Sequence, residues 1–199
     1  MATLPSSIPP SPLDPLWRMS VDQYHAMIDA GILSSDSPVE LIEGILVRKM
    51  GKNPSHRFTN RETRVALEEI TPQGWYVDDQ APITLSDSEP EPDVLVARGR
   101  SENYRHRHPG PADIALVVEI SESSLNRDRA IKTRVYARER IPCYWILDLT
   151  SSRVEVRTEP IDGACRVVTV YSATDEIPVV IDGTEIGRIP AARLFGPTS

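Results

Sequence analysis

The sequence is poor in cysteine and has no long apolar segment. Its only cysteines, Cys143 and Cys165, do not form a Cys-x-x-Cys pair, which argues against a disulfide framework or a cysteine zinc site and suits a reducing compartment. No apolar run approaches the roughly 20 residues that a membrane helix needs. The first residues contain neither the basic nor the apolar segment of a secretory signal. We therefore expect a cytoplasmic protein without a membrane partner.

Basic residues are fewer than acidic ones, and the net charge is −7. This balance argues against a general nucleic-acid coat protein, because non-specific DNA affinity comes mainly from basic side chains that neutralise phosphates. Two segments have the opposite sign: residues 98–108 hold four arginines against one glutamate, and residues 127–140 hold six basic against two acidic residues. These segments could form a basic face, although a solvated charged helix explains the second equally well.

Turn and cap signals divide the chain into short elements. Residues 1–16 are rich in proline and serine, without a hydrophobic period, and are expected to form a flexible arm. Ser20 can cap a helix that ends at Gly31, and residues 39–47 (VELIEGILV) are typical of two short strands joined by a tight turn. Ser55 is expected to cap a second helix that runs to Ile70.

The remaining chain is rich in strand patterns. Strands are expected over residues 75–85, 92–97, 113–121 and 143–148, with one helix over about 125–140, and a β meander (RVEVRT, RVVTVY, IPVVID) precedes a final amphipathic turn. The strand–helix–strand order over 113–148 predicts a βαβ crossover. We therefore expect one α/β (α+β) domain over residues 17–199, with a mixed sheet, flanking helices and a C-terminal meander.

A glutamate interrupts the most apolar of these strands. Burying Glu119 as an isolated carboxylate would cost several kcal/mol, so it must be protonated, paired with Arg127 or Lys132, or bound to a cation. Asp93 begins the preceding strand, directly after a proline, where it forms a turn or finds a metal. If the two strands are neighbours, their carboxylates converge, and a site made only of oxygen ligands favours Mg²⁺.

Lys132 is a third candidate in this group. It shares a helix stripe with Val135 and Tyr136, which directs its stem toward the sheet. A lysine there can orient an attacking water or offset the charge of a phosphate. The alternative is an exposed pair with Asp128, worth about 0.2–0.5 kcal/mol.

Taken in order, these residues resemble the PD-(D/E)XK nuclease superfamily, and more closely its Uma-two family of restriction-endonuclease-like proteins. The carrying segments, over roughly residues 20–195, are VELIEG, the Ser-His of NPSH, EPDVLVA, VVEISESS, the Asp and Lys of NRDRAIKTRVYA, and IPCYWILD. The resemblance implies a restriction-endonuclease-like core and an endonuclease that hydrolyses DNA with Mg²⁺ or Mn²⁺. Asp93 and Glu119 would bind the metal. Most of the superfamily has its lysine where this chain has Ser121, so Lys132 would position the nucleophilic water.

The resemblance also suggests roles for two further residues. Glu40 falls where the family has an early glutamate, and it either completes the metal shell or caps the hairpin. His56, on the inward stripe of its helix, is either a proton shuttle or a satisfied core histidine. Five arginines of the two basic segments are expected to contact the DNA backbone: Arg98, Arg100, Arg105, Arg127 and Arg129. An enzyme that cuts both strands benefits from two-fold symmetry, which favours a homodimer.

Two alternatives to a nuclease stay open. The chain could be a non-catalytic nucleic-acid or protein interaction module that keeps the nuclease fold, or Asp93, Glu119 and Lys132 could form a purely structural ion network. No helix-turn-helix, zinc finger or other readout element is recognisable, so the sequence does not identify a target site or distinguish DNA from RNA.

Overall fold

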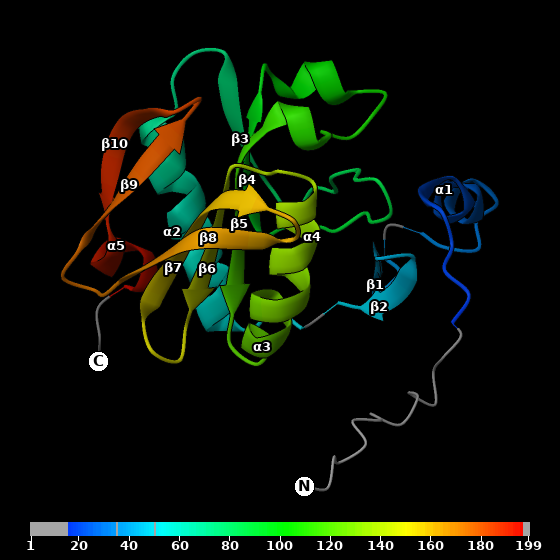
Figure 1. Cartoon of the computed structure of the whole chain (residues 1–199), viewed down its shortest axis with the longest axis horizontal. Helices are drawn as coiled ribbons and strands as arrows, with labels where there is room; N and C mark the ends of the chain where they lie inside the picture. Colours follow the sequence, from blue (N-terminus) through cyan, green and yellow to red (C-terminus); the bar gives the residue numbers. More distant parts are fainter. Residues whose placement is uncertain (1–15, 35, 50, 197–199) are drawn as a thin grey trace, which may run out of the picture.

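The computed structural model describes residues 16–34, 36–49 and 51–196. Its centre is a six-stranded sheet in the order β3-β4-β5-β6-β7-β8 (Figure 1). The predicted arm over residues 1–16 lies, except for Leu16, outside the described residues. The elements in chain order are α1 (Val21–Asp29), β1 (Val39–Ile42), β2 (Ile45–Arg48), α2 (Pro54–Ile70), β3 (Trp75–Asp79), β4 (Val94–Arg98), the short helices η1 (Ser101–Tyr104) and η2 (Pro111–Asp113), β5 (Ile114–Ser121), α3 (Leu125–Arg127), a π-helical turn η3 (Asp128–Lys132), α4 (Thr133–Arg138), β6 (Cys143–Asp148), β7 (Arg153–Ile161), β8 (Ala164–Tyr171), β9 (Glu176–Ile181), β10 (Thr184–Pro190) and α5 (Ala191–Phe195).

The sheet is mixed because one of its pairs is a crossover. β5 and β6 are parallel, and every other neighbouring pair is antiparallel. The chain connects β5 to β6 through α3, η3 and α4, as a parallel pair requires. The predicted βαβ unit and the α/β fold class are confirmed.

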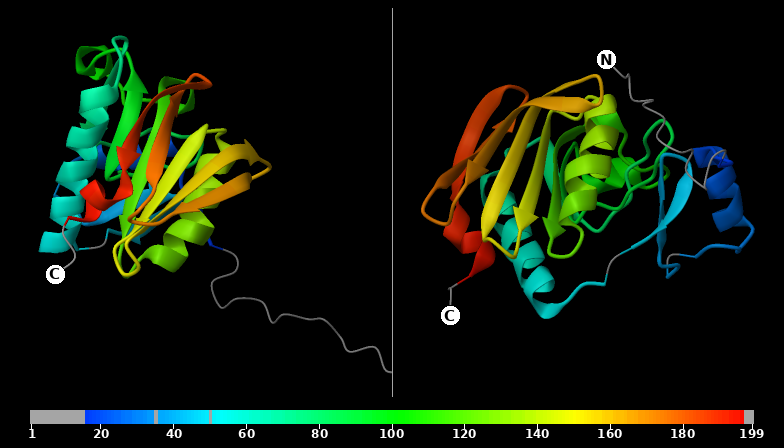
Figure 2. Two further views of the ribbon diagram at one scale, coloured as in Figure 1. Left: turned by 90° about the vertical axis from the view of Figure 1, so that its left-hand side faces the viewer. Right: turned by 60° about the horizontal axis from the view of Figure 1, so that its bottom comes forward.

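Alternate residues of β5 pack into different halves of the core. Val118 belongs to a cluster that includes Leu67 of α2, whereas Val117 belongs to a second cluster that includes Tyr136 of α4. Successive side chains of a strand point to opposite faces, so a strand covered on both faces is apolar at nearly every position. Helices α2 and α4 cover the two faces (Figure 2), and all eight residues of β5 are buried. The prediction of a central strand is confirmed.

The N-terminal segment forms a small unit beside this sheet. Ser20 caps α1 as predicted, with a reciprocal contact to Gln23, and β1 pairs with β2 around Gly44. Gly44 has a φ of +74°, and a Cβ there would lie 2.7 Å from the Cβ of Arg18. Only glycine fits this turn without strain. The hairpin is therefore held in one position, which matters because it contributes Glu40 to the candidate site.

Two predicted boundaries near the start of the sheet are wrong. The cap of α2 is Asn53, whose side chain accepts a hydrogen bond from the His56 backbone N–H, and not Ser55. Asparagine caps as well as serine, and Pro54 suits the first helical position. The strand expected over residues 75–85 ends at Asp79, because Gln80 has a positive φ and Pro82 lacks a ladder donor.

The C-terminal half also differs from the predicted meander. β7 and β8 form the expected hairpin, but β9 pairs with β10, an additional strand over residues 184–190, in a separate two-stranded sheet. Ile177 of β9 and Leu194 of α5 are fully buried in the cluster that contains Leu67. The hairpin and α5 therefore close the α2 side of the core.

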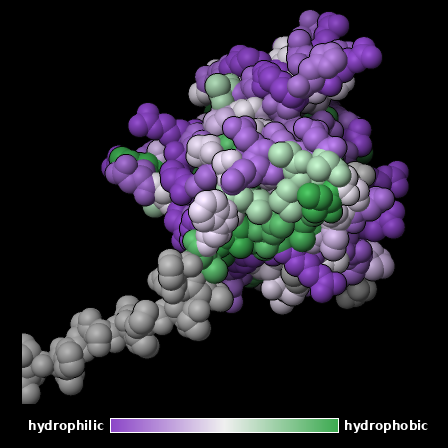
Figure 3. Space-filling view, turned by 90° about the vertical axis from the view of Figure 1, so that its right-hand side faces the viewer, coloured by the Kyte–Doolittle hydropathy of each residue, from purple (hydrophilic) through white to green (hydrophobic). Residues whose placement is uncertain are grey.

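The face that carries α1 has an apolar surface next to the start of the described chain (Figure 3). The exposed large apolar residues of this N-terminal segment are Leu16, Trp17, Ile28 and Ile32. None of the described helices is long and apolar enough to cross a membrane.

We predict that residues 17–199 unfold as one cooperative unit. Leu194→Ala should lower the free energy of unfolding by about 2–5 kcal/mol, because it removes a fully buried side chain from the shared core. Urea denaturation followed by circular dichroism measures this loss. Ile32→Ala, at a residue that is 67% exposed, is the control and should change stability by less than about 0.5 kcal/mol. Loss of the α5 region in a separate, earlier transition would contradict a single domain.

Candidate active site

Asp93 and Glu119 meet because β4 and β5 are neighbours. The antiparallel register sets Val94 opposite Val118, so the next pair along the strands is Asp93 opposite Glu119. Directly opposed residues of antiparallel strands point to the same face. Asp93 Oδ2 also accepts a hydrogen bond of 2.8 Å from the backbone N–H of Ile120, which fixes its carboxylate against β5. The two predicted acids therefore line one cavity.

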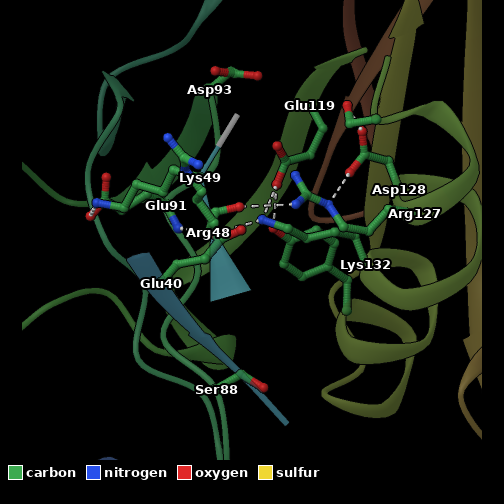
Figure 4. A network of polar contacts seen from close by, with 12 residues as sticks. Glu40, Arg48, Lys49, Ser88, Glu91, Asp93, Glu119, Arg127, Asp128 and Lys132 are labelled. Carbon is green, nitrogen blue, oxygen red and sulfur yellow. Dashed lines mark hydrogen bonds and ion pairs between the residues drawn. The ribbon is translucent and has the colours of Figure 1, made fainter. Parts of the chain in front are cut away.

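Lys132 connects this pair to the N-terminal hairpin. Its ammonium Nζ donates to Glu119 Oε1 and to Glu40 Oε2, each at 2.9 Å (Figure 4), and only 2% of the residue is exposed. Lys132 ends the π-helical turn η3, and such turns often occur at functional sites. The alternative of an exposed pair with Asp128 is not formed.

Buried hydroxyl groups support the ion cluster. The Tyr136 hydroxyl donates to Glu119 Oε1 at 2.7 Å. Asp128 Oδ2 accepts hydrogen bonds from Ser121 at 2.5 Å and from Ser124 at 2.6 Å. Ser121 thus anchors the start of the turn that carries Lys132.

The cluster contains more buried acids than buried bases. Burial raises the pKa of Glu119 to about 8; the Lys132 ammonium opposes this rise, and the Asp93 carboxylate adds to it. Burial alone would lower the pKa of Lys132, but the Glu119 and Glu40 carboxylates hold it above its ordinary value. Lys132 therefore stays charged and cannot act as a base. The excess of carboxylates would be relieved by a further cation.

A cavity of about 60 Å³ opens onto these carboxylates, which is room for several waters or a partly hydrated ion. Lys52 Nζ lies 3.6 Å from Asp93 Oδ1, and His56 Nε2 lies 3.2 Å from Asp93 Oδ2. His56 Nδ1 is buried and has no hydrogen-bond partner among the described residues. His56 is therefore a cavity residue and not a fully satisfied core histidine.

Arg127 reaches across the same cavity. Its Nη1 donates to the Arg48 carbonyl at 3.3 Å, and its Nε lies 3.9 Å from Asp128 Oδ1. This buried Nε makes no hydrogen bond within the described part of the chain. A guanidinium group with a free donor beside a cavity is suited to a phosphate oxygen.

The donor set fits a hard divalent cation through two carboxylates. Asp93 Oδ1 and Glu119 Oε2 accept no hydrogen bond from the described residues, and neither does Glu40 Oε1. Glu40 Oε2 accepts from Lys132 and from the Glu91 backbone N–H. Within residues 16–34, 36–49 and 51–196, no group of three or more His, Cys, Asp or Glu side chains is arranged to hold a metal. Mg²⁺ is nevertheless suited to such a site, because it binds few carboxylates and keeps several waters.

The structure brings together only part of the predicted site. Glu40, His56, Asp93, Glu119, Arg127 and Lys132 all line the one cavity. Arg98, at the far end of β4, lies 4.3 Å from the Trp75 ring centroid and pairs with Asp182. Arg129 pairs with Glu155, and Arg100 and Arg105 line two other cavities. DNA contacts of these four arginines stay predictions.

Other residues that line the cavity were missed by reasoning from the sequence, among them Lys49, Lys52 and Glu91. Glu91 gave a usable signal, because it precedes Asp93 by two residues in an extended segment and so points to the same side. The two lysines follow β2 and gave none, since their position beside Asp93 depends on long-range packing.

Comparison with known proteins identifies the family and the fold, and does not test the site residues. Residues 21–187 match the model of the Uma2 family, which is described as "Putative restriction endonuclease". A similar solved structure is the crystal structure of a "putative nuclease belonging to DUF820" from Anabaena variabilis, with a TM-score of 0.68, 17% identity, and coverage of 89% of this chain and 97% of that one. This second likeness shows the fold alone. No protein with a curated description matches the sequence. The resemblance found in the sequence is confirmed.

We predict that metal-free protein loses stability as the pH rises. The folded state keeps Glu119 protonated up to about pH 8, whereas an unperturbed glutamate ionises near 4.5. The folded state therefore binds the extra proton, and the free energy of unfolding should fall as pH rises between these values. Urea denaturation in a chelating buffer measures the slope, and Glu119→Gln should reduce it. An equal slope in the wild type and the variant would contradict the assignment.

Proposed function

This chain belongs to the Uma2 family, and we propose that it is a divalent-metal-dependent endonuclease that hydrolyses DNA. The family and the fold support a nuclease-like function. The observation that carries the finer proposal is the convergence of Asp93 and Glu119 on one cavity beside the buried Lys132. Its location in the cytoplasm stays a prediction from the sequence.

Asp93 and Glu119 would hold Mg²⁺ or Mn²⁺ through the two carboxylate oxygens that accept no hydrogen bond from the described residues. A cation bound there supplies charge stabilisation at the phosphoryl group and a more acidic bound water. Glu40 is not a metal ligand in this proposal. It holds Lys132 in place, and its own position is fixed by the Glu91 backbone N–H at 3.2 Å. His56 and the Ile120 backbone N–H both contact Asp93 Oδ2 and hold that carboxylate in place.

Lys132 would orient the attacking water with a fixed positive charge. An ammonium group has three N–H donors, and Glu119 and Glu40 accept two of them. The third is available to a water in the cavity. Because the pKa of Lys132 is held above its usual value, the group stabilises negative charge as the reaction proceeds and takes no proton from the water.

Arg127 and Lys52 are suited to bind the substrate phosphate. The side chain of Lys52 is 34% exposed at the rim of the cavity, and Arg127 Nε makes no hydrogen bond with the described residues, although it lies within ion-pair distance of Asp128. Both lie beside the proposed metal ligands, so a phosphodiester that reaches the metal also meets these two cations. The proposed DNA contact thus begins at the catalytic cavity.

Cleavage of supercoiled plasmid and of single-stranded DNA by purified protein tests the proposal. We expect cutting with Mg²⁺ or Mn²⁺ and none in EDTA. Glu119→Gln and Asp93→Asn should each lower the rate by about 100-fold or more, because each removes a proposed metal ligand. Glu122→Gln is the matched control, since it makes the same chemical change three residues from Glu119 at an exposed position, and it should cut like the wild type.

A thermal-shift titration with Mg²⁺ separates the remaining outcomes. Wild type and Glu122→Gln should be stabilised by the metal, and Glu119→Gln should not. Cutting that persists unchanged in Glu119→Gln, or that needs no metal, would overturn the assignment. Metal binding without cutting of either DNA would favour a non-catalytic interaction module.

A further inference from the structure

Among the strands of the described residues, β8 forms one edge of the six-stranded sheet. It pairs with β7 on one side, and the sheet order ends with it (Figure 2). Its eight residues, ACRVVTVY, contain no proline, glycine or acidic residue and only one charge, that of Arg166. Outward-facing N–H and C=O groups of such a strand are a template for another strand.

Apolar side chains are exposed along this edge on both faces of the sheet. Val167 is 38% exposed, Val168 46% and Val170 52%. Val167 shares a face with Thr169, and Val168 and Val170 lie on the other face, because side chains alternate along a strand. Natural edge strands are usually short, charged or covered, and this one is none of these.

The opposite edge of the same sheet is protected. β3 has only five residues and ends in Asp78 and Asp79. Asp79 pairs with Arg64 of α2 at 2.8 Å. Charged residues of this kind block strand addition. The contrast indicates that the unprotected β8 edge is normally covered.

We propose that β8 pairs antiparallel with β8 of a second copy of this chain and forms a homodimer. An antiparallel strand pair about a two-fold axis is self-complementary, so one edge is sufficient for both partners. Hydrogen-bonded and non-hydrogen-bonded residue pairs alternate along an antiparallel ladder, so two successive pairs cannot be related by symmetry. The two-fold axis must therefore pass between one residue and the same residue of the second copy. A register that pairs most of the strand puts Val167 or Val168 on the axis.

Charge does not oppose a second copy. Arg166 is the one charged residue of β8, is exposed near its beginning, and has no ion pair among the described residues. In both registers Arg166 lies opposite a valine and away from its own copy.

An apolar groove continues the same surface. A cavity of about 430 Å³ lies between the sheet and the β9–β10 hairpin, with Val156, Thr169, Tyr171 and Val180 in its wall. A two-fold axis perpendicular to the sheet keeps each face on its own side. Val167 of the second copy therefore lies on the groove face and extends the apolar contact beyond the backbone ladder.

Sedimentation over a range of protein concentrations tests this interface. We expect a dimer for the wild type and a monomer for the double variant Val168→Lys, Val170→Lys, with an unchanged circular dichroism spectrum because both positions are exposed. The lysines would place four charges along the paired strands. Ile32→Lys, in the apolar segment next to α1, is the control and should remain dimeric. A monomeric wild type, a dimeric double variant, or dissociation by Ile32→Lys would overturn the proposal.

Disulfide trapping tests the register. In a Cys165→Ser background, Val167→Cys or Val168→Cys should form a cross-linked dimer on oxidation, because self-opposed residues lie about 4.5–5.5 Å apart and a disulfide needs about 4.4–6.8 Å between Cα atoms. Ile32→Cys should not. Trapping of Ile32→Cys, with none at either β8 position, would place the contact elsewhere. Neither experiment depends on the proposed nuclease activity.

Discussion

The buried ammonium of Lys132 is the contact on which the candidate site depends. It joins Glu40 of the N-terminal hairpin to Glu119 of the central strand, and Lys132 itself belongs to the crossover helix. Three segments far apart in the sequence therefore meet at one charge. Removal of the charge would leave the buried acids Glu40 and Glu119 without their ion-pair partner, which is usually far more costly than the net value of the ion pair. The same contact is one of several that position the hairpin, together with the bridge between Leu41 and Glu89 and the ion pair between Glu43 and Arg134.

The apolar sheet makes this concentration of charge possible. β5 is buried along its whole length, and α2 and α4 pack on its two faces. The two neighbouring strands hold Asp93 and Glu119 side by side, and both side chains are largely buried. The same burial that raises the pKa of Glu119 makes the site favourable for a cation. The carboxylates that would bind a metal therefore lower the stability of the metal-free protein, a trade-off that is common in functional sites.

Local sequence patterns predicted the centre of the site, because its residues break those patterns. Glu119 stands out in an apolar strand, and Lys132 lies on the inward stripe of its helix. The surroundings depend on distant contacts, which a pattern does not contain: Lys52 gave no sign that it approaches Asp93. The predicted start of α2 was wrong because two nearby residues, Asn53 and Ser55, can both cap a helix. β10 was missed because Gly187 weakens its strand pattern, although β9 supplies its partner.

The proposed dimer has a geometric consequence for the proposed activity. Pairing of two β8 strands would join two six-stranded sheets and separate the two Glu119-bearing strands by seven inter-strand steps, or about 34 Å at roughly 4.8 Å per step. The register from Glu119 through Ile146 and Glu155 to Val170 places each glutamate two or three residues along the strand from an axis at Val168 or Val167. Neighbouring strands are rotated by roughly 20–25° relative to one another, so seven steps turn the two glutamates toward different sides of the joined sheet. We therefore expect the two sites of the proposed dimer to act independently, each on its own stretch of DNA.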